Sequence, residues 1–504
     1  MRLFAELSWR NREWCEMRVT VIGAGYVGLV TSACLAEMGH EVIAVERDLE
    51  KLRLLQTKTC PIHEELLPGL LEKHTGKGLH FSAALANAVT HAQIIFICVA
   101  TPASRDGSTD LTQVDIAAEE IAKCLQHKVV VVEKSTVPVR TCDAICQTII
   151  SCGGHRDQFS VASNPEFLRE GTAVRDFLLP DRIVIGADDD FSRRLLRELY
   201  SPLVTGRYYK RADSILSSRQ HRPELLETTV RSAELIKHAS NAFLAMKISF
   251  INGIANLSEA LGADIDAVCQ GVGSDRRIGR EFLRPGIGFG GACFPKDLTA
   301  FAALAKQARC PLPLLEMTRR INERQRLLFV RKVRKALGSI RGKHIACLGL
   351  AFKAETDDVR NSPAVEVISL LLRYKAHIRV FDPAATERAR RQFNGKSISF
   401  ADDPYGTMPG ADALVLLTEW PQFAGLDLGR VRMLLRRPVI IDGRNLYSPE
   451  AMRKAGFCYW SCGRQPVPVM SSFQPEITTS SCGDSGPVMP MHPVGQSIAP
   501  SSSP

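Results

Sequence analysis

Short apolar runs alternate with stretches of helical periodicity through most of the chain. In the first half these runs lie at 18–22, 41–46, 92–100, 128–135, 159–164 and 182–187. Continuous apolar runs of this length, separated by helical patterns, are typical of buried parallel strands. The pattern predicts an α/β fold in which a doubly wound parallel sheet is covered by helices on both faces. Functional side chains are expected beyond the carboxyl ends of its strands.

A second block of the same alternation begins near Lys343, with apolar runs at 344–350, 377–383, 411–419 and 438–443. It predicts a second Rossmann-type domain. Between the two blocks the period becomes helical, with one broad stripe formed by Leu235, Ala239, Ala242, Phe243, Met246, Ser249, Phe250, Gly253 and Leu257. We therefore expect a long central helix, from Thr228 to about Gly262, that joins the two Rossmann-type domains.

The domain boundaries follow from these patterns. We expect a first Rossmann domain at 17–227, a central helical region at 228–325 and a second Rossmann-like domain at 326–462. The polar stretch 209–227 is interpreted as a loop or an insertion. Residues 1–16 are interpreted as an N-terminal extension, with Met17 as an alternative start of translation. Residues 463–504 are rich in Pro and Ser, so we expect a disordered tail.

The composition is that of a globular protein, because 45% of the 504 residues are hydrophobic and 23% are charged. The formal net charge is +10, and the excess lies mainly between Arg193 and Arg222 and between Arg319 and Lys343. We interpret these stretches first as solvated helix faces, then as sites for a phosphate-bearing small ligand, and last as a nucleic-acid surface. The fifteen cysteines are scattered without zinc-like spacing, so no metal site is expected. We see no secretory signal and no apolar run of membrane length, so we expect a cytoplasmic protein without a membrane partner.

The most specific motif is Gly23-Ala24-Gly25-Tyr26-Val27-Gly28. It follows a predicted strand, opens a helix, and lies 18 residues before Glu46 at the end of the next strand. In this context the glycines permit a tight turn, the approach of a pyrophosphate and close helix–strand packing. Glu46 is expected to accept hydrogen bonds from a ribose and to repel a 2′-phosphate. The motif therefore predicts NAD as the cofactor.

Cys293, in GIGFGGACFPKD, differs from the other cysteines because it follows a Gly-rich run in a polar stretch. Lys296 and Asp297 lie close to it in sequence, and a nearby cation is expected to favour the thiolate. Cys293 is therefore the candidate nucleophile, although a small buried cysteine is the ordinary alternative.

Two further pairs are candidates for acid–base or oxyanion chemistry. Glu166 and Glu170 lie four residues apart just after a strand end, and Glu166 is a candidate general base; a solvated turn is the alternative. Lys237 and Asn241 share one face of the predicted long helix, where they are candidates to stabilise an oxyanion. A lysine that simply reaches solvent is as good an interpretation. Thr101 and Thr136, near strand ends, are weaker candidates for cofactor contacts, and Phe352, Lys353 and Arg444 for substrate contacts.

Several long motifs in the same order resemble the UDP-glucose 6-dehydrogenases, within the nucleotide-sugar 6-dehydrogenase family. They are GAGYVG, SNPEFLREGTAVRDF, ELIKHASNAFLAMKISFIN, GFGGACFPKD, GLAFKAETDDVRNSPA and IIDGRN, and the resemblance runs from about Met17 to Trp460. It implies the four-electron oxidation of UDP-glucose at C6 to UDP-glucuronate with two NAD⁺. A thiohemiacetal and then a thioester on Cys293 would be the covalent intermediates.

The resemblance also implies residue roles. The implied catalytic residues are Cys293, Asp297, Lys237, Asn241, Glu166 and Thr136. The cofactor positions are Gly23, Gly25, Tyr26, Val27, Gly28, Glu46, Lys51, Thr101, Thr136, Glu170, Lys296 and Arg360. The substrate positions are Glu166, Phe167, Leu168, Arg169, Lys237, Asn241, Arg277, Phe282, Gly290, Phe352, Lys353 and Arg444. Arg277 resembles an arginine that family members contribute across a subunit interface, which implies a homo-oligomer, at least a dimer, formed through the central region.

Other functions are kept as alternatives. The same chemistry on GDP-mannose or a UDP-N-acetyl-hexosamine is the nearest, and assays with each nucleotide sugar discriminate them. A one-step hydroxy-acid or acyl-CoA dehydrogenase would have no use for Cys293. A nucleic-acid-binding protein would show salt-sensitive binding, and a catalytically dead relative would lack turnover.

Overall fold

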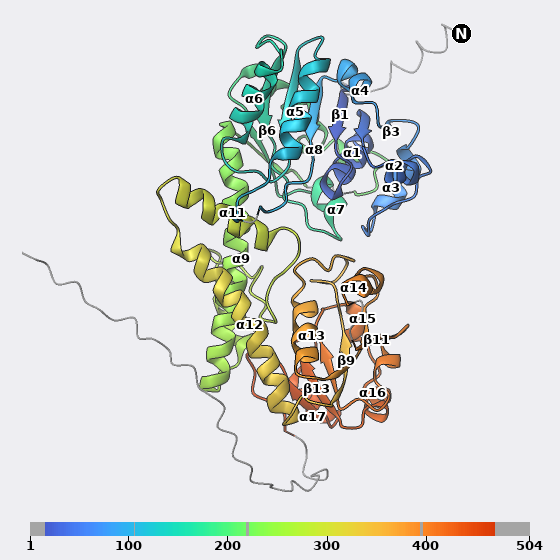
Figure 1. Ribbon diagram of the computed structural model, residues 1–504, viewed down its shortest axis with the longest axis vertical. Helices are drawn as coiled ribbons and strands as arrows, with labels where there is room; N and C mark the ends of the chain where they lie inside the picture. Colours follow the sequence, from blue (N-terminus) through green and yellow to red (C-terminus); the bar gives the residue numbers. More distant parts are fainter. Residues whose placement is uncertain (1–15, 105, 218–220, 394–396, 469–504) are drawn as a thin grey trace, which may run out of the picture. The chain divides into compact units, whose positions relative to one another are not determined.

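The computed structural model describes residues 16–104, 106–217, 221–393 and 397–468. Residues 1–15 of the expected N-terminal extension and residues 469–504 of the expected tail lie outside the described residues. Along the described chain, two parallel-sheet α/β parts follow one another, with a group of long helices between them in sequence (Figure 1). This confirms the predicted fold class.

The first sheet has eight strands in the order β3-β2-β1-β4-β5-β6-β7-β8. Six of them were expected from the apolar runs, and β3 and β8, at the two edges, were not. The strands are parallel except that β6 and β7 pair antiparallel at Ser163 and Gly186. Their bounds are β1 (Arg18–Ile22), β2 (Glu41–Val45), β3 (Leu79–Ser82), β4 (Ile94–Ile97), β5 (Val129–Glu133), β6 (Phe159–Ser163), β7 (Arg182–Gly186) and β8 (Glu224–Thr228).

Both faces of this sheet are covered by helices, because alternate strand residues enter two different cores. Val19 and Val21 belong to one apolar cluster and Ile22 to another. The covering helices are α1 (Tyr26–Glu37), α2 (Leu49–Gln56), α3 (Leu67–His74), α4 (Leu85–His91), α5 (Thr112–Cys124), α6 (Thr141–Ser151), α7 (Ala173–Leu178) and α8 (Asp190–Val204). The alternation of strand residues between two cores is what a doubly wound sheet requires.

The stretch 209–227, interpreted as a loop or an insertion, contains parts of two regular elements. The short 3-10 helix η1 (Tyr208–Lys210) inserts Tyr208 and Tyr209 into the first core. Strand β8 then begins at Glu224 and pairs with β7 in parallel. This strand escaped the pattern because Leu225 and Leu226 are adjacent and Leu226 is exposed, so no alternation of apolar and polar residues marks it.

The long central helix is α9 (Val230–Leu261), close to the predicted 228–262. It begins at the N-cap Thr229, whose hydroxyl accepts from the Ser232 N–H, and ends at Gly262 with a φ of +75°. The residues of the predicted stripe differ in burial according to their size. Small residues such as Ala242 and Ser249 are buried, whereas Leu235, Phe243, Phe250 and Leu257 are exposed.

Three further helices follow: α10 (Ile265–Ser274), α11 (Phe294–Gln307) and α12 (Pro313–Leu337). The expected domain boundary at 325/326 falls inside α12, because this amphipathic helix continues without a break up to the second sheet. No helix of the described ranges is long and apolar enough to cross a membrane.

The second sheet has six parallel strands in the order β11-β10-β9-β12-β13-β14. Its elements are β9 (His344–Leu348), α13 (Pro363–Arg373), β10 (His377–Phe381), α14 (Thr386–Gln392), β11 (Ile398–Phe400), η2 (Tyr405–Thr407), β12 (Ala413–Leu416), α15 (Pro421–Ala424), α16 (Leu428–Leu434), β13 (Val439–Asp442), α17 (Pro449–Lys454) and β14 (Cys458–Trp460). The four strands predicted for this half are present.

Candidate active site

The Gly-rich turn between β1 and α1 has the geometry that its sequence predicted. Gly23 has a φ of +93°, and a Cβ there would lie 2.6 Å from the Cys98 carbonyl oxygen. A Cβ on Gly28 would lie 1.8 Å from the Gly23 carbonyl oxygen, so this position needs glycine for helix–strand packing. A Cβ on Gly25 would meet no atom within 4 Å. Packing within the protein therefore does not require glycine at position 25, and the space beside it is open to a ligand.

A dinucleotide fits the residues around this turn. No side chain caps the N-terminus of α1, where unpaired N–H groups and the positive end of the helix dipole attract phosphate. Glu46, just after β2, accepts from the N–H groups of Arg47 at 2.8 Å and Asp48 at 3.1 Å through Oε1. Its Oε2 lies 3.0 Å from Lys51 Nζ. These contacts hold a carboxylate where a ribose is expected.

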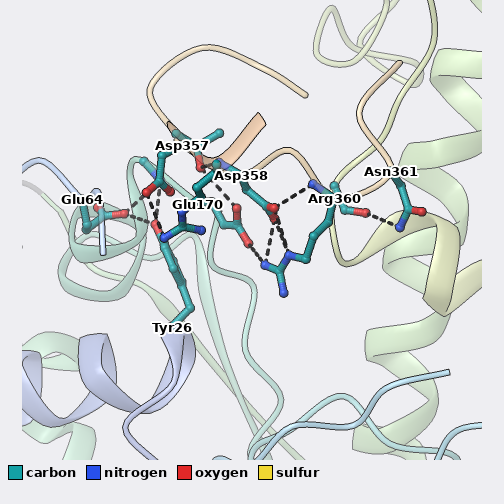
Figure 2. A network of polar contacts seen from close by, with 11 residues as sticks. Tyr26, Glu64, Glu170, Asp357, Asp358, Arg360 and Asn361 are labelled. Atoms are coloured by element: carbon teal, nitrogen blue, oxygen red, sulfur yellow. Dashed lines mark hydrogen bonds and ion pairs between the residues drawn. The ribbon is translucent and has the colours of Figure 1, made fainter. Parts of the chain in front are cut away.

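Tyr26, the first residue of α1, belongs to a buried polar network (Figure 2). Its hydroxyl donates to Glu64 Oε2, and both oxygens accept from the Gly171 N–H, at 2.7 and 2.9 Å respectively. Burial and the Glu64 carboxylate raise the pKa of Tyr26, so the hydroxyl stays protonated. Sequence reasoning missed Glu64, which lies in a segment with no motif. The network fixes the loop that begins at Glu166 against α1.

The loop that leads to Cys293 is held by amide side chains of two helices. The Oδ1 atom of Asn252 on α9 accepts from the Gly286 N–H at 2.8 Å. On α12, Asn322 exchanges hydrogen bonds with the backbone of Phe289 at 2.8 and 3.0 Å, and Gln325 donates to the Gly286 carbonyl at 3.0 Å. Sequence reasoning missed these amides, although polar residues on buried helix faces were the available signal. They stabilise a backbone conformation that glycines alone would leave free.

Cys293 is the N-cap residue of α11 and is exposed. A nearby cation, Lys237, favours the thiolate as expected, but other effects outweigh it. Protein atoms around the sulfur desolvate it, and the negative charges of Glu166 and Asp297 add to this effect, so the pKa of the Cys293 thiol rises to about 12. Lys237 lowers the pKa only in part. The ammonium of Lys296 pairs with Asp297 Oδ1 at 3.2 Å.

Lys237 and Glu166 form a buried ion pair next to this thiol, with 2.8 Å between Nζ and Oε1. The other oxygen of Glu166 accepts from the Leu168 N–H at 2.6 Å. Glu166 and the charges of Cys293 and Asp297 raise the pKa of Lys237 against its desolvation. Lys237 therefore stays an ammonium, and it also faces the Phe167 ring, 5.5 Å from its centre.

A chain of polar contacts links Asp297 to Thr101 and Thr136, two of the predicted cofactor residues. Asn241 Nδ2 donates to Asp297 Oδ2 at 2.7 Å, and both residues are buried. Lys296 Nζ, which pairs with Asp297, also donates to Thr101 Oγ1 at 3.2 Å. Thr101 in turn donates to the Thr136 carbonyl at 3.0 Å. The structure thus brings the predicted catalytic residues together with two predicted cofactor residues.

Several predicted substrate residues follow strands β9 and β13 of the second α/β part. Arg444 Nη2 donates to the Phe352 carbonyl at 2.9 Å, and Arg444 Nη1 donates to the Gly288 carbonyl at 3.4 Å. Burial lowers the pKa of Lys353, whose ammonium lies 5.7 Å from the Phe352 ring centre. A Cβ on Gly291 would lie 3.0 Å from the Phe352 ring. These cations therefore adjoin the Gly-rich loop.

Other predicted substrate residues make their contacts elsewhere than with Lys237, Glu166 or Asp297. Phe282, with a φ of +63°, packs against Phe294 with 6.4 Å between ring centres. Arg169 is engaged by Asp176, with 2.6 Å between Nη2 and Oδ1. The Arg277 side chain is 88% exposed and pairs with Asp275. Arg277 is thus not brought to the Cys293 group by the contacts of this chain.

Sequence reasoning also missed Lys134, which follows β5. Its ammonium is buried and donates to Asn164 Oδ1 at 2.9 Å, and the Tyr200 hydroxyl donates to the same oxygen at 2.5 Å. Desolvation, with the nearby charge of Lys237, lowers the pKa of Lys134 to about 8. A charged residue at the end of a buried apolar run was the signal that could have identified it.

The sequence of the chain matches known protein families and curated relatives. Three domain models of the UDP-glucose/GDP-mannose dehydrogenase family match the chain: the NAD binding domain at 17–204, the central domain at 231–324 and the UDP binding domain at 346–449. The UDP-glucose 6-dehydrogenase TuaD of Bacillus subtilis is 43% identical over 89% of this chain and 94% of the relative. The UDP-glucose 6-dehydrogenase of Rhizobium meliloti is 44% identical over 89% of this chain and its whole length, 100%.

Solved structures of nucleotide-sugar dehydrogenases have a fold similar to that of this chain. A UDP-glucose dehydrogenase from the archaeon Pyrobaculum islandicum superposes with a TM-score of 0.79 at 36% identity, covering 89% of this chain and 98% of that one. A UDP-D-ManNAc dehydrogenase from Pyrococcus horikoshii has a TM-score of 0.75 at 26% identity, covering 89% and 99%. Residues 209–227 lie between the first two family matches.

Proposed function

The chain belongs to the UDP-glucose/GDP-mannose dehydrogenase family, and from this we propose that it oxidises UDP-glucose at C6 to UDP-glucuronate with NAD⁺. The relatives at 43 and 44% identity that carry the name UDP-glucose 6-dehydrogenase favour this sugar. The first α/β part holds NAD and the second holds the UDP group. GDP-mannose and UDP-N-acetyl-hexosamines are the alternative substrates.

One observation carries the mechanism: the Asp297 N–H donates to the Cys293 carbonyl at 2.8 Å, and Asp297 Oδ2 accepts from Asn241, one turn of α9 after Lys237 of the ion pair with Glu166. Bound NAD⁺ would supply the hydride acceptor, once for the alcohol and once for the thiohemiacetal carbon. Two oxidations of one carbon pass through an aldehyde, which must be retained. A nucleophile beside an ammonium and two carboxylates is suited to retain it.

The charge states suggest how the chain's residues act. The Cys293 sulfur adds to the aldehyde carbon and its proton ends on O6, so the thiohemiacetal forms without a net loss of protons. The ammonium of Lys237 and the amide of Asn241 stabilise negative charge that develops on O6. After the second oxidation the carbon is a thioester, and water cleaves its C–S bond to give the acid and the free thiol. Glu166 and Asp297, with Thr136, orient that water and accept its proton.

An assay that counts NADH per sugar tests this proposal. The purified protein, supplied with UDP-glucose and excess NAD⁺, is expected to form two NADH for each UDP-glucuronate. One NADH per sugar would limit the reaction to an aldehyde product. Oxidation of GDP-mannose or a UDP-N-acetyl-hexosamine but not UDP-glucose would contradict the choice of sugar.

We also propose that the protein is at least a homodimer. Leu235, Phe243, Phe250, Leu257 and Leu261 are exposed on α9, and their spacing of seven or eight residues, closing with four, keeps them on one stripe. An apolar stripe of this kind is costly in water and typical of subunit interfaces. We propose that Arg277 reaches the sugar site of the neighbouring subunit. The scattered cysteines of the sequence favour a reducing compartment, the cytoplasm.

A further inference from the structure

Residues 355–361, which we call the bridging segment, contact both loops that carry the proposed chemistry. The segment belongs to the second α/β part and lies between β9 and α13. One loop starts at Glu166 in the first part, and the other leads to Cys293 at the start of α11. Figure 2 shows the segment at the centre of the polar network that includes Tyr26 and Glu170.

The bridging segment holds the first loop through Glu170 and Gly171. Thr356 Oγ1 donates to Glu170 Oε2 at 3.3 Å, and Arg360 Nη2 lies 3.5 Å from Glu170 Oε1. Desolvation and the neighbouring Asp358 charge raise the pKa of Glu170 to about 7. A Cβ on Gly171 would lie 2.1 Å from the Glu355 carbonyl oxygen. The two backbones are therefore in direct contact.

The same segment holds the second loop two residues before the thiol. The Gly291 N–H donates to the Arg360 carbonyl at 3.1 Å, and Asn361 Nδ2 donates to the Gly291 carbonyl at 3.2 Å. A Cβ on Gly290 would lie 2.2 Å from the Asn361 carbonyl oxygen. Both polar groups of the Gly291 backbone are thus bound by consecutive residues of the bridging segment.

Asn361 makes these contacts from a left-handed backbone conformation, with a φ of +48°. Such a conformation is uncommon for residues other than glycine, although Asn tolerates it best. It is held by its neighbour Ser362, which caps α13 and donates to the Leu350 carbonyl at 2.6 Å. A backbone held in this way, with its side chain directed at the nucleophile loop, points to function rather than to packing alone.

We propose that Asn361 is a positioning residue for Cys293: by holding the Gly291 carbonyl it sets the place of the thiol relative to Lys237 and Glu166. The proposal rests on the proposed function, because it takes Cys293 as the reacting group. It extends that function by making the second α/β part responsible for the geometry of the covalent step as well as for binding the nucleotide.

Two variants remove the hydrogen bond while keeping the backbone conformation accessible. Asn361→Gly removes the donor, and Asn361→Asp replaces it with an acceptor that faces the Gly291 carbonyl. We expect kcat for UDP-glucose oxidation to fall about tenfold in both, while KM for NAD⁺ changes by less than about twofold. In the ligand-free protein, iodoacetamide should alkylate Cys293 about threefold faster, because a released loop desolvates the thiol less.

Lys375→Gly is the matched control, because Lys375 also has a left-handed backbone, with a φ of 61°, but lies on an exposed turn after α13. It should leave kcat and alkylation unchanged. The proposal is overturned if both Asn361 variants keep the wild-type kcat and the wild-type alkylation rate. It is also overturned if their losses merely follow a lowered unfolding midpoint. Alkylation of Cys293, followed by peptide mapping, needs no turnover, so a wild-type protein inactive on UDP-glucose would reject the proposed function without deciding the role of Asn361.

Discussion

At the residue scale, the surroundings of Cys293 disfavour its thiolate, although the proposed reaction needs a nucleophilic sulfur. Desolvation, together with the carboxylates of Glu166 and Asp297, raises the pKa of the thiol, yet these carboxylates are the groups best placed to handle water at the thioester stage. Cys293→Ser should lower the formation of UDP-glucuronate by at least about 100-fold, because an alkoxide is a poorer nucleophile and leaving group here. Cys310→Ser is the control, since Cys310 is also exposed. Near-normal NADH formation by Cys293→Ser would refute the covalent route.

The sign of the electrostatic effects on this thiol can be tested without turnover. Glu166 raises the pKa of Cys293 and Lys237 lowers it. Glu166→Gln should therefore lower the thiol pKa and speed alkylation by iodoacetamide at pH 8, whereas Lys237→Met should raise the pKa and slow it. A shift of one pKa unit changes the thiolate fraction about tenfold. Rates that move in the same direction in both variants would show that these charges do not act on the thiol.

At the scale of elements, the turn between β1 and α1 contains one glycine that packing requires, Gly28, and one that we assign to cofactor binding, Gly25. Gly28→Ala places a Cβ against the Gly23 carbonyl, so it should lower the free energy of unfolding by about 2 kcal/mol or more. Gly25→Ala meets open space and should change unfolding by less than about 1 kcal/mol while raising KM for NAD⁺ at least about tenfold. Urea unfolding and initial rates measure the two effects. Equal behaviour of the two variants would contradict this division.

Elements also show what the sequence could predict. The strands that the apolar pattern missed, β3, β8, β11 and β14, are the four edges of the two sheets. Strands β3, β8 and β11 are partly exposed, as edge strands can be, so they show no continuous apolar run. Strand β14 is largely buried but only three residues long, so its apolar run is too short to mark a strand. The central strands and α9 were predictable because both faces or one broad stripe must be apolar. The end of α12 was not, because its amphipathic period runs through the expected domain boundary.

At the scale of the whole molecule, the candidate site depends on contacts between distant parts of the sequence. Motifs identified Cys293, Lys237 and Glu166, but not the amides of Asn252 and Asn322 or the role of Asn361. Those side chains act on backbone groups far away in sequence, and hydrogen bonds to backbone leave no spacing pattern in the chain. The candidate reactive residues were therefore predictable from the sequence, whereas the side chains that position them could be identified only from the fold.

The proposed role of the exposed apolar stripe of α9, a subunit interface, also concerns the whole molecule. Phe243 and Phe250 are 58% and 52% exposed, so Phe243→Asp combined with Phe250→Asp should leave the fold intact. In a twofold interface the two copies would bury four added carboxylates without partners, so the dimer should dissociate to a monomer in light scattering. KM for UDP-glucose should then rise, because the Arg277 of the neighbour is lost. Met433→Asp, at an 81% exposed position on α16, is the control. A wild-type monomer, or a double variant that remains dimeric, would contradict the assignment of this stripe to the subunit interface.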